Sequence, residues 1–368
     1  MMMLAMTLVM SAASYAETKI GDIYYLLNSE NKNASVSYEF DLAKESRSFY
    51  SGDVVIPETV TYGGVTYKVT GIKSSAFNAC ENLTSVTIPN TVTEIADNAF
   101  SYCTNLKSLH IPASVAKIGD MAFAYSGLSS VTVDKNNKFY DSRNDCNAVI
   151  ETATNTLVIG SDKTVIPDGV TKIAKAAFSS CTGLQTIVIP NSVTRIGKEA
   201  FSGCSSLASI TLPEGLDEIE ANTFANCGAL TSIVLPSSLT SIGEYAFRYC
   251  GLKSITIPAS VWNIEARAFD GCKDLTLVEN NATVPQTIYS GTFSVFDKLV
   301  VPEESAEAYR KSPIWNTFSN INDVTTGIAP LNSELSPLTS SRYALNGKRL
   351  DKASKGVNIS NGKKYVVK

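Results

Sequence analysis

The stretch CSSLASITLPEGLDEIEANTF, residues 204–224, is one copy of a pattern that recurs along most of the chain. Within it, residues 210–212 alternate apolar and polar side chains, which predicts a short β-strand. Pro213 ends this strand because proline has no backbone N–H to donate to a sheet. Residues 216–219 predict a second extended segment. The small and polar residues before Phe224 favour a short helical turn that places the phenylalanine ring in the interior.

Phenylalanine and proline recur with one shared period. Each step between the phenylalanines is 23 residues, except for one step of 55 and a last step of 22. A unit of this length cannot bury its apolar face alone, but stacked copies pair their strands in parallel, about 4.8 Å apart, around a continuous core. The period therefore predicts a repeat solenoid. The two series are Phe77, Phe100, Phe123, Phe178, Phe201, Phe224, Phe247 and Phe269, and Pro89, Pro112, Pro167, Pro190, Pro213, Pro236 and Pro258.

The 55-residue step contains one normal period and an enlarged repeat at about residues 134–166. Asp134 stands where a proline is expected, and a polar loop follows over 134–145. Two apolar runs, 148–150 and 157–159, then predict a hairpin. We expect the solenoid to continue through this repeat while the polar loop projects from it.

An N-terminal cap must cover the first coil, since an uncovered coil would expose the edge of its ladder. Residues 17–70 are the candidate for a β-rich cap. They contain alternating segments at 23–27, 54–56 and 65–69, and a Gly63-Gly64 turn precedes the last of these.

A C-terminal cap is predicted over residues 299–322, after a solenoid that covers residues 71–298. It begins with a strand that ends in proline and continues with a helical segment at 305–309. Trp315 and Phe318 are large enough to close the apolar interior.

Segments outside the solenoid are predicted at both ends of the chain. Residues 1–16 are apolar and end in the small-x-small pattern of a signal peptide, which predicts secretion. A basic start is missing, however, and a buried N-terminal element is the alternative. Residues 323–340 predict a linker. Residues 341–368 predict a hairpin tail with turns at Asn346-Gly347 and Asn361-Gly362.

Charge is unevenly distributed along the chain. From Arg342 onward, eight basic residues face Asp351 alone, so the tail carries +7 and leaves −11 on the preceding chain, for a total of −4. The basic tail can be interpreted as a contact for an anionic surface polymer or as a plain soluble hairpin. The acidic body lacks the basic stripe with interleaved aromatics that nucleic-acid binding requires.

Composition indicates an ordered protein without a membrane span. Apolar residues make up 44% and charged residues 18% of the chain, which suits a packed core. After residue 16 no run of 18 apolar residues occurs. We expect a monomer that binds no nucleic acid.

The single histidine, His110, is not predicted to be catalytic. It lies in a predicted strand and points opposite to its apolar neighbours, and a Ser-His-Asp triad would need a serine and a carboxylate to converge on it. Ser85, Ser108 and Ser130 share its face, but the strand rows supply no carboxylate. We therefore expect a surface histidine and no enzyme activity.

Eight cysteines allow two interpretations. Six occupy one repeat position, so stacked neighbours lie about 4.8 Å apart, within reach of a disulfide. Their side chains point in parallel, which suits the disulfide dihedral angle poorly, so we favour buried free thiols that pack as small apolar groups. A spacing of 23 residues does not suit a zinc site. The six are Cys80, Cys103, Cys181, Cys204, Cys227 and Cys250.

The polar loop of the enlarged repeat contains oxygen ligands that calcium could use. Asp134, Asp141 and Asp145 are the acidic candidates, but the glycine and closing glutamate of an EF-hand are missing. Turn formation explains Asp and Asn equally well. We therefore predict neither a metal nor a cofactor.

A candidate binding face follows from the outward positions of the first strand of each repeat. Its two rows are rich in hydroxyl and β-branched side chains and contain no aromatic residue, so an extended protein surface suits it better than a sugar. Strand propensity and cross-strand packing explain the same composition. Tyr102, Tyr125, Tyr245 and Tyr249, on the turn side, form a second conceivable patch. The rows are Ser85, Ser108, Ser130, Thr186, Ser209, Ser232 and Ser254, and Thr87, His110, Thr132, Val188, Thr211, Val234 and Thr256.

The proline, Ala-Phe and Cys-x-x-Leu positions resemble the BspA-type, or Treponema pallidum-type, leucine-rich repeat over about residues 50–320. This resemblance implies a leucine-rich repeat solenoid with a parallel strand ladder and short helical turns. It also implies a bacterial surface protein, typical of Bacteroidetes and linked to adhesion to host matrix proteins or other bacteria. Residues 343–349 and 361–364 are similar to C-terminal sorting segments of secreted Bacteroidetes proteins.

Three functions are compatible with these features. The leading hypothesis is a secreted or cell-surface protein that binds a protein or extracellular-matrix partner through the solenoid surface. The second is a structural spacer that displays the terminal segments. A hydrolase ranks last.

Overall fold

The computed structural model describes the solenoid and its caps together with short strands in the tail. By its contacts the chain divides into two units, Met1–Asn322 and Asp323–Lys368, which are described separately. The predicted signal peptide, 1–16, and linker, 323–340, lie outside the described residues. Residues 17–38 and 49–322 are described in full; for 40–41, 46–47, 342–343, 349–350, 356–360 and 363–367 only strand backbone is described.

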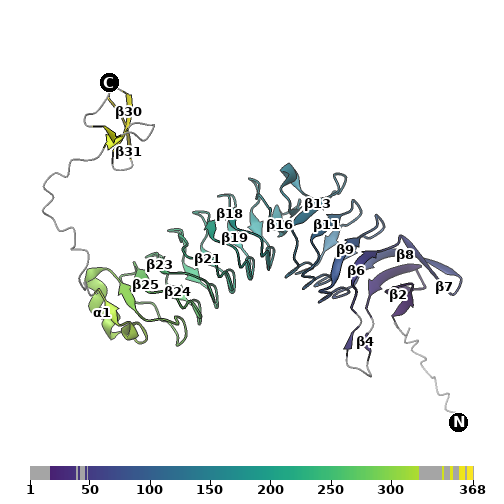
Figure 1. Cartoon of the computed structure of the whole chain (residues 1–368), viewed down its shortest axis with the longest axis horizontal. Coiled ribbons are helices and arrows are strands. Elements are labelled where there is room, and N and C mark those ends of the chain that lie inside the picture. Colours follow the sequence, from purple (N-terminus) through teal and green to yellow (C-terminus); the bar gives the residue numbers. More distant parts are fainter. Residues whose placement is uncertain are drawn as a thin grey trace, which may run out of the picture. The chain divides into compact units, whose positions relative to one another are not determined.

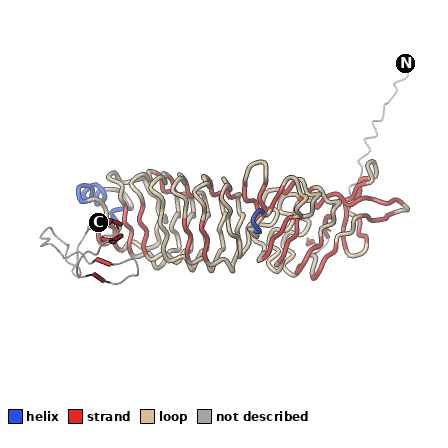
Figure 2. Tube along the Cα trace, turned by 90° about the horizontal axis from the view of Figure 1, so that it is seen from above, coloured by secondary structure: helices blue, strands red, loops and turns tan. Residues whose placement is uncertain are grey.

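The first unit is a solenoid whose coils stack in register and form two columns of short parallel strands (Figures 1 and 2). Ile187 pairs with Ile210, and Ile173 with Ile196, so each residue lies beside its equivalent 23 positions along the chain. This is the fold that the period predicts.

The columns differ in strand length. The first column contains β6 (Gly52–Val55), β9 (Leu83–Thr87), β11 (Ser108–Ile111), β13 (Ser130–Val133), β18 (Thr186–Val188), β20 (Ser209–Thr211), β23 (Ser254–Ile257), β25 (Leu277–Asn280), β26 (Lys298–Val300) and β27 (Asn320–Ile321). The second contains β8 (Val65–Ile72), β10 (Glu94–Ile95), β12 (Lys117–Ile118), β16 (Thr156–Ile159), β17 (Lys172–Ile173), β19 (Arg195–Ile196), β21 (Glu218–Ile219), β22 (Ser241–Ile242) and β24 (Asn263–Ile264).

The N-terminal cap adds its strands to the N-terminal end of the second column. β1 (Thr18–Ile20), β2 (Ile23–Asn28) and β3 (Asn33–Ser37) form an antiparallel sheet, and β3 then pairs in parallel with β8. β7 (Thr59–Tyr62) joins β8 through a turn in which Gly63 and Gly64 adopt φ angles of 58° and 78°. The segment expected at 54–56 corresponds to β6, which pairs with β9 and so begins the first column rather than joining the cap sheet. β4 (Phe40–Asp41) and β5 (Ser46–Arg47) pair with each other.

The segment around each phenylalanine is a series of single turns, not a continuous helical turn. Cys80 N–H donates to Phe77 O within its own coil, at 3.0 Å, whereas Phe77 N–H donates to Ala99 O of the next coil, at 2.7 Å. Backbone amides from residue 75 to residue 80 alternate in this way between the two coils. A positive φ of 57° at Ala79 allows the alternation. Half of the amides in this segment thus bond to the next coil, whereas in a helix all of them would bond within one coil.

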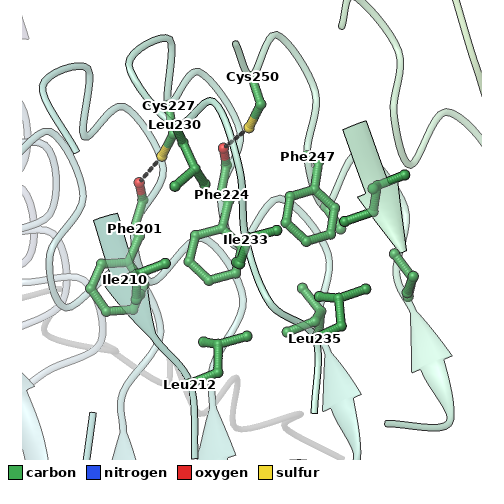
Figure 3. Close-up of a cluster of buried hydrophobic side chains, with 14 of the residues drawn as sticks. Phe201, Ile210, Leu212, Phe224, Cys227, Leu230, Ile233, Leu235, Phe247 and Cys250 are labelled. Carbon is green, nitrogen blue, oxygen red and sulfur yellow. Dashed lines mark hydrogen bonds between the residues drawn. The ribbon is translucent and has the colours of Figure 1, made fainter. Parts of the chain in front are cut away.

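Stacked phenylalanine rings form the centre of the core. Neighbouring ring centroids lie 4.6–5.6 Å apart with interplanar angles of at most 17°. Figure 3 shows Phe201, Phe224 and Phe247 packed in this way beside the isoleucines and leucines of the first column. The stack runs from Phe77 to Phe123, and again from Phe178 to Phe293.

The enlarged repeat separates these two stacks. β15 (Val149–Glu151) and β16 form the expected antiparallel hairpin. Val149 and Ile159 pack into the N-terminal core, whereas Ile150 and Leu157 pack into the C-terminal core. The polar loop contains β14 (Tyr140–Asp141) and a 3₁₀ turn, η1 (Arg143–Asp145), and it does not project along its whole length. Tyr140 is buried, and its hydroxyl accepts a hydrogen bond from Ile118 N–H at 2.9 Å.

Gly160 occupies the phenylalanine position of the enlarged repeat. Its N–H donates to Ala177 O at 2.8 Å, the same inter-coil bond that Phe178 N–H makes to Ala200 O at 2.8 Å. A Cβ at Gly160 would overlap the ring of Phe178. The absent side chain therefore makes room for the first ring of the C-terminal stack.

The C-terminal cap closes the last coil with aromatic side chains. The predicted helical segment corresponds to η2 (Glu303–Ser305) and α1 (Ala306–Lys311), and η3 (Trp315–Thr317) follows. Trp315 and Phe318 are buried against Phe293, and Trp315 Nε1 donates to Gln286 O at 2.8 Å.

The tail unit contains one four-stranded antiparallel sheet in the order β29 (Arg349–Leu350), β28 (Arg342–Tyr343), β30 (Gly356–Ser360) and β31 (Lys363–Val367). β28 pairs with β29, and β30 pairs with β31. These pairs flank the two predicted Asn-Gly turns.

We predict that Gly160→Ala destabilises the protein by about 1–3 kcal/mol, because the new methyl group overlaps the Phe178 ring. Gly215→Ala is the matched control, since its added Cβ would meet no atom within 4 Å. The control should change stability by less than about 1 kcal/mol. Urea unfolding followed by circular dichroism measures both, and equal midpoints for the two variants would contradict the placement of Gly160.

Candidate functional site

The two outward rows of the first strand column form an exposed face, which we call the strand face. Its residues are the fourteen given above, and all are exposed except Ser85, which is half-buried. Ser232 and Val234 do not lie in a strand as expected, because the structure assigns none to residues 231–236. Inward neighbours such as Leu109 and Val131 are buried, so the period of two in each strand separates core from surface. Ser108 pairs in register with Ser130, as the sequence rows require.

Carboxylates stand at both ends of the strand face. Ser85 Oγ donates to Asp53 Oδ1 at 2.7 Å, and Thr256 Oγ1 donates to Glu279 Oε2 at 2.8 Å. Hydrogen bonds from Ser85 and Thr84 hold the pKa of Asp53 below its usual value. The sequence analysis did not include Asp53 or Glu279, although the strand period extended by one coil in each direction would have identified both.

The middle of the strand face is uncharged and partly apolar. Val188 and Val234 are 67% and 83% exposed, and Thr211 lies between them in the same row. His110 Nδ1 lies 3.0 Å from Thr132 Oγ1, so the partner of this histidine is a neutral hydroxyl rather than a carboxylate.

The enlarged repeat interrupts the strand face between β13 and β18. Asn147 Oδ1 accepts the Val131 N–H at 2.6 Å, and Asn147 Nδ2 donates to Ser129 O at 3.1 Å, so one side chain occupies the edge of β13. Beside it lies a hollow of about 350 Å³. Its lining consists of Ser129, Ser130, Val131, Thr132, Val133, Ser142, Asp145, Asn147 and Lys163.

The acidic side chains of the polar loop stabilise its own turns. Asp134 Oδ1 accepts hydrogen bonds from the backbone and side chain of Asn136, at 2.8 and 3.1 Å. Asp141 accepts two hydrogen bonds from the guanidinium of Arg143, at 2.9 and 2.7 Å. In the part of the chain that the structure describes, no group of three or more His, Cys, Asp or Glu residues could hold a metal ion.

All eight cysteines are buried free thiols. Five of them do more than fill space, because the thiol donates a hydrogen bond to the carbonyl of the phenylalanine in the preceding coil; these are Cys103, Cys204, Cys227, Cys250 and Cys272. Figure 3 shows Cys227 Sγ bonded to Phe201 O, at 3.2 Å, and Cys250 Sγ bonded to Phe224 O, at 3.0 Å. Burial raises the pKa of the Cys272 thiol to about 12 and raises that of Cys204 well above its usual value.

The tyrosines of the turn side form two separate groups. Tyr102 and Tyr125 stack with their centroids 4.7 Å apart. Arg248 lies 5.0 Å from the ring centroid of Tyr245 and 4.6 Å from that of Tyr249. Each group has one tyrosine that is nearly half exposed, so both are small surface patches rather than one continuous platform.

We predict that iodoacetamide at pH 8 leaves all eight cysteines unmodified in the folded protein. Burial keeps the reagent away from the thiols, whereas alkylation requires an accessible thiolate. All eight should react in denaturant, and intact-mass spectrometry counts the adducts. Modification of Cys204 or Cys250 in folded protein would contradict the buried cysteine ladder.

The chain is similar to known leucine-rich repeat proteins in sequence and fold. Residues 58–150 and 160–276 match the family described as BspA type leucine rich repeat region, in six copies. No curated protein matches the sequence significantly. The described residues contain no helix that is long and apolar enough to cross a membrane.

Several solved structures are similar to this chain. A leucine rich cell surface protein from Faecalibacterium prausnitzii is 24% identical, with a TM-score of 0.44, over 72% of this chain and 94% of that protein. The pneumococcal vaccine antigen PcpA is 16% identical, with a TM-score of 0.48, over 84% and 97%. The leucine rich repeat protein of T. pallidum is 21% identical, with a TM-score of 0.28, over 83% and 98%.

Proposed function

Because the chain belongs to the BspA-type leucine-rich repeat family, we propose that it is a secreted or cell-surface adhesion protein of a bacterium that binds a protein or matrix partner through the strand face. The family consists typically of non-enzymatic binding proteins at the bacterial surface. The finer assignment to one face rests on the geometry of this chain.

The observation that supports this proposal is the exposed, uncharged middle of the strand face. Main-chain hydrogen bonds between β18 and β20 hold the side chains of residues 186–188 and 209–211 in fixed rows, so a partner pays little conformational entropy to use them. The described residues offer no hydrogen-bond partner to the hydroxyls of Ser209, Thr211 and Ser232, which remain available to a ligand. Exposed Val188 and Val234 add apolar area between them.

Two alternative functions have less support. A structural spacer requires only the solenoid, and it leaves the uncharged middle of the face without a role. A hydrolase of the Ser-His-Asp type requires a carboxylate that orients the histidine, and the contact of His110 is with the neutral hydroxyl of Thr132.

We predict that the double variant Ser209→Arg/Ser232→Arg weakens binding to an immobilised extracellular-matrix preparation by at least about tenfold, because an interface cannot desolvate two unpaired charges without loss. Biolayer interferometry with purified protein measures the affinity. Both positions are exposed, so folding should be unaffected.

Ser237→Arg is the control for this experiment. Ser237 is exposed in a loop that follows the strand face, so the substitution adds the same kind of charge away from the two rows. It should bind as the unmodified protein does. Equal binding by the double variant and the control would favour the spacer.

A further inference from the structure

Four basic side chains gather on two adjacent coils of the second strand column. They are Lys172 and Lys175 on one coil, and Arg195 and Lys198 on the next, and all four are exposed. Together with Glu220 they line a hollow of about 300 Å³, whose other lining residues are Thr156, Ile173, Ala174 and Gly197. We call these four residues the basic array.

The two positions of the basic array recur in other coils with different charges. In β10 and β12, nearer the N-terminus, the place of Lys172 and Arg195 is taken by Glu94 and Lys117. These two residues form an ion pair at 2.7 Å. That pair is the complementary arrangement that stability alone favours. On the C-terminal side of the array, β21 has Glu218 at the same position. The doubled positive charge is therefore a local feature and not a property of the repeat.

The fold holds the charges of the basic array against their mutual repulsion. Lys172 and Arg195 are register partners in β17 and β19, where like charges destabilise a sheet. The coils cannot separate, because Gly197 N–H donates to Ile173 O at 3.0 Å and Ala176 N–H donates to Lys198 O at 2.9 Å. Because this arrangement of charges costs stability, it calls for another explanation than folding.

Acidic groups of the protein do not neutralise the basic array. The buried carboxylate of Glu220 accepts a hydrogen bond from Arg195 Nε at 2.7 Å, which orients the guanidinium and leaves its two terminal nitrogens available. Among the described residues, Lys172, Lys175 and Lys198 form no ion pair. Four cations and one carboxylate therefore line the hollow, and Glu218 and Asp217 of the following coil act on Arg195 from outside it, on a chain whose body is otherwise acidic.

We propose that the basic array binds the sulfate or phosphate groups of a linear polyanion, at a site separate from the strand face. Ammonium and guanidinium groups are the usual partners of such oxyanions. Two cations on each of two coils about 4.8 Å apart match repeated charges along a polymer better than one small anion. The hollow has no aromatic lining on which a base or sugar ring could stack, so it recognises charge.

The test measures binding of heparin, as a sulfated polysaccharide, and of linear polyphosphate to the full chain by isothermal titration calorimetry at several salt concentrations. Lys172→Gln/Lys198→Gln should weaken binding of the polymer that binds by about tenfold at low ionic strength. The slope of log affinity against log salt concentration should also become shallower, by the amount that corresponds to the loss of about two ionic contacts. Relief of repulsion should leave the melting temperature unchanged or higher.

Lys253→Gln/Lys298→Gln is the matched control, because both lysines are exposed, lie in or beside the first column, and remove the same charge. It should bind as the unmodified chain does. Binding of heparin alone or of polyphosphate alone shows whether the site takes sulfate or phosphate groups. Failure of both polymers to bind, or equal weakening by both double variants, would overturn the proposal.

Discussion

Backbone hydrogen bonds between coils determine the geometry of every other part of this solenoid. Strand pairs such as Ile187 with Ile210 and turn bonds such as Phe77 N–H to Ala99 O lock each residue beside its equivalent in the next coil. The register between coils therefore determines which side chains are neighbours. The nearest partner of a side chain is the residue one period away, whatever that residue is.

This constraint explains both the core and the surface. In the interior it stacks identical rings and identical thiols, which is tolerable because phenylalanine packs well in offset stacks and most of the stacked cysteines bond to a carbonyl of the preceding coil. On the surface it produces rows, and the character of a row depends on a few substitutions. Hydroxyls in register give the strand face, and lysine beside arginine gives the basic array.

The period of the sequence predicts those structural features that repeat in every coil. The strand positions, the buried phenylalanines and the outward direction of His110 follow from it, because one rule of alternation applies in every coil. The turn geometry does not follow, since propensity cannot show that alternate amides bond to the neighbouring coil. Gly160 and Asn147 are equally hidden, because each replaces a repeated element by a different kind of residue in a coil of different length. The basic array was visible as two pairs 23 residues apart, but it becomes a site only when the coils are adjacent.

The hairpin of the enlarged repeat affects how unfolding spreads along the solenoid. Its alternate side chains are divided between two cores, and the ring stack stops on one side of it and restarts on the other. In a linear array, cooperativity is transmitted only through the contacts between nearest neighbours. Because the ring stack is missing at this junction, unfolding that begins at one terminus is expected to stop here rather than spread to the coils beyond.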